Sequence, residues 1–88
     1  MIKWDDVNWD DPDFSDTTVA LGYLDHDTLA FRITKGEAQS VRFLPPVKVY
    51  WLYDYEGGNK KMYRQTKHTL EQVKVHVENT YTVRRYYA

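Results

Sequence analysis

The sequence contains no cysteine among its 88 residues, and it has only four glycines and three prolines. The absence of cysteine excludes a disulfide framework, a thiol nucleophile and a cysteine-ligated zinc site. No apolar run approaches the roughly 20 residues that a membrane-spanning helix needs. Residues 1–6 also lack the apolar segment of a secretory signal, so we expect a cytoplasmic protein that contacts no membrane.

Chain length and composition predict one small globular domain. Eighty-eight residues are too few for two independent hydrophobic cores. Hydrophobic residues make up 42% of the chain and charged residues 28%, which is typical of a folded domain rather than a disordered tail. Aromatic residues are abundant, with eight tyrosines, three tryptophans and three phenylalanines. Tyrosine and tryptophan combine a large apolar surface with a polar atom, which suits them to interfaces.

The net charge of −1 conceals an uneven distribution of charge along the chain. Residues 1–29 contain one lysine and eight aspartates, whereas residues 30–88 contain eleven basic and five acidic residues. This asymmetry indicates that the acidic segment either folds back on the basic part of the chain or faces a basic partner. An acidic leader that is simply solvated, beside scattered basic residues, would explain the same pattern.

Residues 1–16 are predicted to form an acidic, aromatic N-terminal arm without regular structure, attached to a compact domain over residues 17–88. Trp4, Trp9 and Phe14 recur every five residues, a spacing that fits neither a helix nor a strand. Aspartate and proline, which are frequent here, disfavour the interior of both elements. The rings are expected to attach the arm either to its own domain or to a partner, and both alternatives stay open.

Alternating apolar and polar residues predict an antiparallel sheet in the middle of the chain. Residues 17–24 and 28–34 alternate in this way on either side of the polar turn 25–27, which is typical of a β-hairpin. This hairpin is expected to end at residues 35–37. A short strand is expected over residues 40–44, where two prolines follow and remove backbone donors from the ladder.

The clearest strand signal covers residues 47–55. Val49 and Trp51 share one of its two faces, and their apolar character favours that face as the core side. A turn over residues 56–59 contains two glycines and leads into a polar strand over residues 60–65.

The C-terminal segment fits a helix better than a strand. An apolar stripe at helical spacing consists of Leu70, Val73, Val77 and Tyr81. Thr69 and Gln72 form a capping box, which marks a helix start. The valines on either side of Val75 also alternate as they would in a strand, and valine prefers strands. A helix over residues 69–79 followed by a short strand over residues 81–87 is therefore favoured.

Taken together, these segments predict an α+β fold. We expect an antiparallel sheet of four to six strands with one helix, at about residues 69–79, packed on it. An all-β small barrel is the alternative.

The C-terminal third carries a resemblance to a known class of proteins. A hairpin from Tyr53 to Tyr63, turned at two glycines, leads into the segment from Thr69 to Glu78. This stretch of about 30 residues resembles the ending of many small phage and prophage accessory proteins, which use a sheet and one terminal helix. The resemblance implies a mobile-element context, in which small proteins bind and block host machinery. It carries over no functional residue.

No pattern in the sequence predicts an enzyme, a cofactor or a metal site. The segment Asp6–Asp10 matches the opening of a calcium loop, but Asp11 replaces the required glycine and Thr17 the bidentate glutamate. His68 and His76 are eight residues apart, which is not the i, i+4 spacing of a helical zinc pair. Neither serine lies in a Gly-x-Ser-x-Gly turn.

The acidic arm favours a non-enzymatic protein-interaction module. In this hypothesis the protein is a phage or mobile-element inhibitor, of the anti-CRISPR or anti-defence type, that binds a host protein with a basic surface in the host cytoplasm. Its carboxylates would mimic phosphates and speed association, and its tryptophans would act as apolar anchors. The predicted partner-binding residues are Trp4, Asp5, Asp6, Trp9, Asp10, Asp11, Asp13 and Asp16.

Single-stranded nucleic-acid binding is the first alternative, because basic and aromatic residues interleave in the second half of the chain. The predicted contacts are Lys60, Lys61, Tyr63, Arg64, Lys67, Arg84, Arg85 and Tyr86. Tyr63 and Tyr86 would stack on bases, and the strand over residues 47–55 supplies further rings. The second alternative is a small phage structural or assembly protein, a homo-oligomer in which an edge strand at residues 60–65 pairs with a neighbour.

Overall fold

The computed structural model describes residues 2–6, 17–24, 28–39 and 42–86, with side chains up to Val83. The described elements are β1 (Lys3–Asp6), β2 (Thr18–Tyr23), β3 (Leu29–Ala38), β4 (Val47–Asp54), β5 (Asn59–Arg64) and α1 (Leu70–Tyr86).

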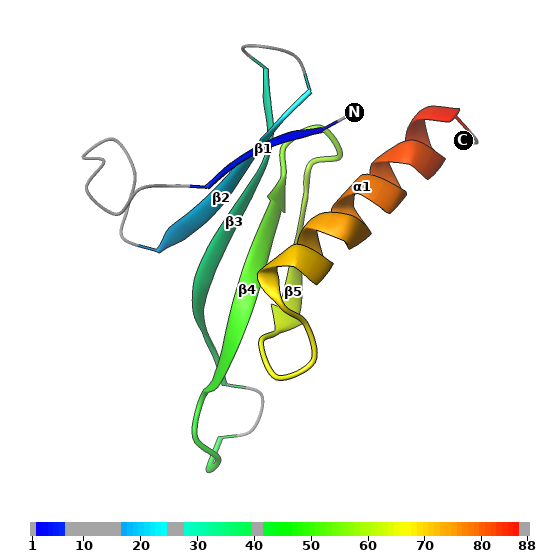
Figure 1. The fold of residues 1–88 in the computed structure, drawn as a ribbon. Coiled ribbons are helices and arrows are strands. Elements are labelled where there is room, and N and C mark those ends of the chain that lie inside the picture. The colour runs from blue at the N-terminus through cyan, green and yellow to red at the C-terminus, as the bar shows by residue number, and fades with distance from the viewer. Residues whose placement is uncertain (1, 7–16, 25–27, 40–41, 87–88) are drawn as a thin grey trace.

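The five strands form one open antiparallel sheet, and α1 lies across one of its faces (Figure 1). Each strand pairs with the next one along the chain, in the order β1-β2-β3-β4-β5. The predicted α+β fold is therefore confirmed. The alternative of a small barrel is wrong, because β1 and β5 stand at the two edges of the sheet and do not close it.

Strand β1 corrects the expectation that residues 1–16 lack regular structure. Lys3–Asp6 pairs with β2, with Trp4 opposite Gly22. A Cβ atom on Gly22 would lie 2.9 Å from the Trp4 ring, so only glycine leaves room for the indole at this position. Because Gly22 has no side chain, β2 can accept an edge strand that carries a tryptophan. The spacing of the tryptophans in the sequence does not predict this strand. Residues 7–16 lie outside the described residues.

The predicted hairpin is confirmed as β2 and β3, but its second strand is longer than expected. β3 does not end at residues 35–37, because Lys35 pairs with Tyr50 and Gly36 with Val49 of β4. The short strand expected over residues 40–44 is wrong where the structure describes it, since residues 42–44 form a turn. Residues 25–27 and 40–41 lie outside the described residues.

Strand β4 and strand β5 confirm the glycine-turned hairpin, but α1 packs on the face of β4 opposite to the one expected as the core side. Leu52, opposite Ile33, belongs to the core cluster beneath α1. Val49 is buried but lies on the other face with Trp51. Alternation along a strand identifies two faces, and only the position of the helix decides which of them becomes the core.

Helix α1 is longer than expected and replaces the predicted strand over residues 81–86, and residue 87 lies outside the described residues. The capping box is confirmed: the Thr69 backbone N–H donates to Gln72 Oε1 at 2.9 Å, and the Gln72 N–H donates to Thr69 Oγ1 at 3.2 Å. Tyr81 extends the helical stripe onto the sheet, with its ring centroid 6.4 Å from that of Phe31. This contact favours continued helix over a new strand.

The hydrophobic core lies between α1 and the sheet. Its central residues are Phe31 and Ile33 of β3, both at most 1% exposed, and Val73 and Val77 of α1. Val75, whose neighbours supported a strand, is exposed, so the helical period decides burial here. No helix among the described residues is both long and apolar enough to cross a membrane.

Candidate nucleic-acid interface

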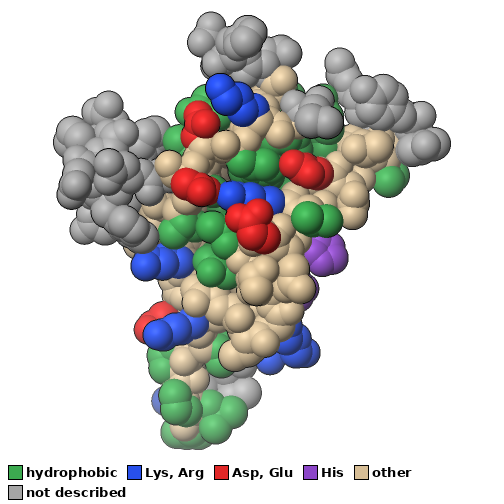
Figure 2. Space-filling view, viewed as in Figure 1, with side chains coloured by type: hydrophobic (Ala, Val, Ile, Leu, Met, Phe, Trp, Pro, Cys, Tyr) green, Lys and Arg blue, Asp and Glu red, His purple; other side chains and the backbone are tan. Residues whose placement is uncertain are grey.

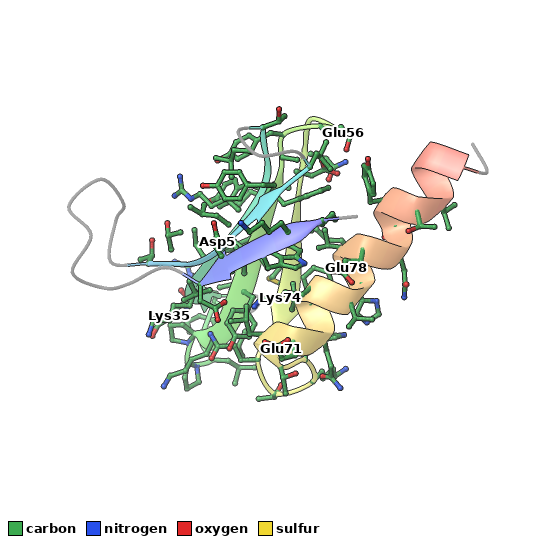
Figure 3. All side chains as sticks on the ribbon, turned by 45° about the horizontal axis from the view of Figure 1, so that its top comes forward. Asp5, Lys35, Glu56, Glu71, Lys74 and Glu78 are labelled. Atoms are coloured by element: carbon green, nitrogen blue, oxygen red, sulfur yellow. The ribbon has the colours of Figure 1, made fainter. Side chains whose placement is uncertain are left out.

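An acidic seam joins β1 to α1 on the helix side of the molecule. We define this acidic seam as Asp6, Glu71 and Glu78 around Lys74. Lys74 Nζ donates to Asp6 Oδ1 at 2.8 Å and to Glu71 Oε1 at 3.4 Å. Figure 3 shows Lys74 between Glu71 and Glu78 along the side of α1 that faces β1, and Figure 2 shows one basic side chain among acidic ones.

Trp4 lies inside this seam and contacts its own domain. Its indole Nε1 donates to Glu78 Oε1 at 2.9 Å, and its ring centroid lies 6.3 Å from that of Phe31. Of the two alternatives for the arm's rings, attachment to the domain therefore holds for Trp4. Asp6 likewise folds back on a basic residue of the domain, since its carboxylate pairs with Lys74.

Opposing effects act on the charge of Lys74. Burial lowers the pKa of its ammonium group, but the hydrogen bond and charge of Asp6, with the charge of Glu71, outweigh burial and raise the pKa above its ordinary value. A group whose pKa is raised by folding contributes stability below its unfolded-state pKa and loses that contribution as the pH rises through its folded-state pKa. The ion pair therefore stabilises the fold at neutral pH.

We expect Lys74→Met to lower the free energy of unfolding at pH 7 by only about 1 kcal/mol, because Asp6 and Glu71 are exposed to solvent screening. Methionine preserves much of the packing of the lysine stem. The difference between the two proteins should shrink once the pH exceeds about 10.5, the ordinary range of a lysine pKa. Urea denaturation of both proteins between pH 7 and 11.5 measures the difference in the free energy of unfolding. A difference that stays constant over this whole range would contradict a stabilising charge on Lys74.

The opposite face of the sheet gathers rings and cations. Pairing across the strands places Arg32 beside Tyr53, and Trp51 beside Met62. We define the basic-aromatic face as Lys3, Tyr23, Arg32, Trp51, Tyr53, Lys60, Met62 and Arg64. Four of these residues are basic, and Asp5 is the single acidic residue that the strand register places on the same side.

The rings on this face already contact cations of the same chain. Lys60 Nζ lies 4.3 Å from the centroid of the Trp51 ring and 5.1 Å from that of Tyr53. The guanidinium carbon of Arg32 lies 5.2 Å from the Tyr53 centroid. Both rings are half-buried, whereas Lys60 is exposed. Aromatic rings and positively charged groups are therefore in cation–π contact on this face.

The structure divides the predicted nucleic-acid contacts between two sides of the sheet. Lys60 and Arg64 belong to the basic-aromatic face, whereas Lys61 lies on the α1 side with its Nζ 5.4 Å from the Tyr63 ring. Tyr63 is 7% exposed and belongs to the core, so the prediction that it stacks on bases is wrong. Side chains alternate between the two faces along β5, and this alternation places Tyr63 on the face that α1 covers. Lys67 is exposed in the turn after β5.

The remaining predicted residues contribute less to the described surface. Arg84, Arg85 and Tyr86 form the last turn of α1, and their side chains lie outside the description. Asp5 is exposed on β1. The other predicted partner-binding residues, Trp9, Asp10, Asp11, Asp13 and Asp16, lie outside the described residues.

Two groupings of side chains in the structure were not predicted from the sequence. Arg32 reaches the basic-aromatic face because it alternates with the core residues Phe31 and Ile33, a signal that the sequence does contain. His68 and His76 come together at one side of α1, with ring centroids 5.4 Å apart. Within the described part of the chain, no group of three or more histidine, aspartate or glutamate side chains gathers to hold a metal ion.

Comparisons with protein-family models, with curated proteins and with solved structures found no match to this chain. Function therefore has to be inferred from the geometry of the described residues.

Proposed function

We propose that the protein is a non-enzymatic binding module that holds single-stranded nucleic acid on its basic-aromatic face. The observation that supports this most directly is the pair of rings, Trp51 and Tyr53, on the central part of a sheet whose basic side chains lie around them. No described helix or strand covers this face. Proteins that bind single strands combine stacking rings with a positively charged path for the backbone.

The spacing of the two rings suits this function. Trp51 and Tyr53 are two residues apart on β4, which places their side chains about 6.8 Å apart on one face. Two unstacked bases of one strand can each meet one ring, because every base has a π surface. Arg32 on β3 and Lys60 on β5 flank the rings and are placed to contact phosphates on either side.

We expect a fluorescently labelled single-stranded oligonucleotide to bind with an affinity that falls steeply with salt. Binding to single strands weakens with a slope of about −0.7 per phosphate contact on a double logarithmic plot of affinity against salt concentration. Two such contacts made by Lys60 and Arg64 contribute about −1.4. The double variant Lys60→Gln/Arg64→Gln should therefore bind more weakly and show a slope shallower by about that amount.

A matched control removes the same charge from the other side of the sheet. Lys48 and Lys61 lie on the neighbouring strands β4 and β5 but face the α1 side. Lys48→Gln/Lys61→Gln should retain the wild-type slope to within experimental error. Equal loss in both double variants would mean that only the net charge matters, and an absence of binding at low salt would exclude the proposed function.

A protein-interaction module is the second candidate, and the acidic seam favours it. Three carboxylates gather around a single ammonium on the helix side, so this surface carries net negative charge. In this form the protein is an inhibitor from a phage or another mobile element that acts in the host cytoplasm on a basic host protein. Absence of nucleic-acid binding, together with salt-sensitive binding of an oligolysine peptide that Asp6→Asn and Glu71→Gln abolish, would favour it.

A further inference from the structure

An apolar hook projects from the end of the sheet where β3 turns into β4. We define the hook as residues 42–46, in which Phe43 is 88% and Leu44 58% exposed and two prolines follow. Figure 2 shows hydrophobic side chains gathered at this lower tip of the molecule. Single apolar residues are common on surfaces, but a phenylalanine and a leucine adjacent on a projecting turn indicate a contact site.

The hook is held in one conformation by Gln39. The Gln39 side-chain amide donates to the backbone carbonyl of Arg42 at 3.0 Å and to that of Leu44 at 3.3 Å. Pro45 and Pro46 restrict the backbone that follows. A segment that is already ordered loses less conformational entropy when it binds, so the hook is prepared to insert its ring into a pocket.

A cleft large enough for an aromatic ring lies between the sheet and α1. Its volume is about 200 Å³. Four buried residues, Phe31, Leu52, Tyr63 and Val77, form its apolar part. The rest of the lining is polar and consists of the buried Asp54 and the exposed Asn59, Lys61 and Thr80. An enclosed apolar cavity of about 150 Å³ is known to hold benzene, so this cleft has room for a phenylalanine ring.

The hook and the cleft lie at opposite ends of the molecule. The hook precedes Val47 at one end of β4, whereas Asp54 at the other end of that strand lines the cleft (Figure 1). Seven residue steps along a strand span about 24 Å, so the hook cannot reach the cleft of its own chain. Each copy therefore carries a projecting ring and a partly apolar cleft, but the two can meet only between copies.

We propose that Phe43 of one copy inserts into the cleft between the sheet and α1 of a second copy. The two surfaces differ, so the contact is heterologous and joins copies head to tail. The apolar area of one hook is small against the roughly 1,200 Å² of a stable interface. Association is therefore weak and rises with concentration. The contact is independent of the basic-aromatic face, which contains neither the hook nor the cleft.

Sedimentation equilibrium over a wide concentration range tests this contact. The weight-average mass of the wild-type protein should rise with concentration and pass that of a dimer at the highest concentrations. Phe43→Ser removes the hook and should lower the association constant at least about tenfold, as loss of a central apolar contact does. Thr80→Trp places an indole at the exposed edge of the cleft and should lower it by a similar factor.

Mixing the two variants provides a sharper test. Phe43→Ser retains an open cleft and Thr80→Trp retains a hook, so each should be monomeric alone and an equimolar mixture should form a dimer and nothing longer. Circular dichroism checks that both variants fold. A monomeric wild type, undiminished association in Phe43→Ser, or a mixture that stays monomeric would each overturn the proposal. Retained oligonucleotide binding by both variants would keep this result separate from the proposed function.

Discussion

Replacing Trp4 with alanine is expected to lower the free energy of unfolding by about 2–4 kcal/mol. The indole packs over Gly22, lies near the ring of Phe31 and donates a hydrogen bond to Glu78. Its removal leaves a space above Gly22 and takes away one of the links between β1 and α1, so that the ion pair of Asp6 with Lys74 remains. A small domain has only about 5–15 kcal/mol of total stability, so this loss is a large fraction.

Thermal and urea denaturation of Trp4→Ala measure this effect. Val83→Ala on the exposed surface of α1 is the matched control and should change the free energy of unfolding by no more than about 0.5 kcal/mol. Hydrogen exchange should also show β1 amides opening more readily in Trp4→Ala than in the control. Unchanged stability in Trp4→Ala would contradict a role of Trp4 in packing β1 on its own domain. It would favour the alternative that Trp4 contacts a partner.

Replacing both rings of the basic-aromatic face should nearly abolish binding of single-stranded nucleic acid. Stacking of a base on an aromatic side chain contributes about 1–3 kcal/mol, and each 1.4 kcal/mol is a factor of about ten in affinity. Trp51→Leu and Tyr53→Leu are each expected to weaken binding by about 5–150-fold, and the double variant by more than either alone. Fluorescence anisotropy of a labelled oligonucleotide at low salt measures this loss.

Tyr50→Leu is the matched control for these rings. Tyr50 immediately precedes Trp51 in the sequence, but its side chain packs beside the core on the α1 side. Its replacement should leave oligonucleotide affinity within about twofold of the wild type, while it lowers stability because it removes packing against the core. A loss of affinity in Tyr50→Leu as large as that in Trp51→Leu would show that general destabilisation, rather than stacking, explains the effect.

The local elements follow closely from the residues that form them. The alternation in β4, the glycines of the turn before β5 and the capping box of Thr69 with Gln72 act over a few residues, and each appears in the structure. The positions at which elements end depend less on neighbouring residues in the sequence. β3 and α1 both extend beyond their expected limits because each continues to find contacts on a neighbouring element, as Gly36 does on β4 and Tyr81 does on Phe31.

The candidate site was only partly accessible from the pattern of residues. The interleaving of basic and aromatic residues points to Lys60, which lies over Trp51 and Tyr53, and to Arg64, which the register places on the same face opposite Val49. It does not separate them from Lys61 and Tyr63, which differ from them by one position on the same strand. A shift of one residue along a strand turns a side chain to the other face, so the site depends on which face the helix covers.

The amino-acid sequence by itself determined the fold class, the β2–β3 and β4–β5 hairpins, the start of α1 and the separation of acidic from basic charge. These features depend on period, turn chemistry and capping, which act between residues close together in the chain. Only the tertiary structure decided that Trp4 joins an edge strand over Gly22 and that Trp51 lies outside the core. Both outcomes depend on contacts between residues far apart in sequence, and such contacts form only when α1 packs on one face of the sheet.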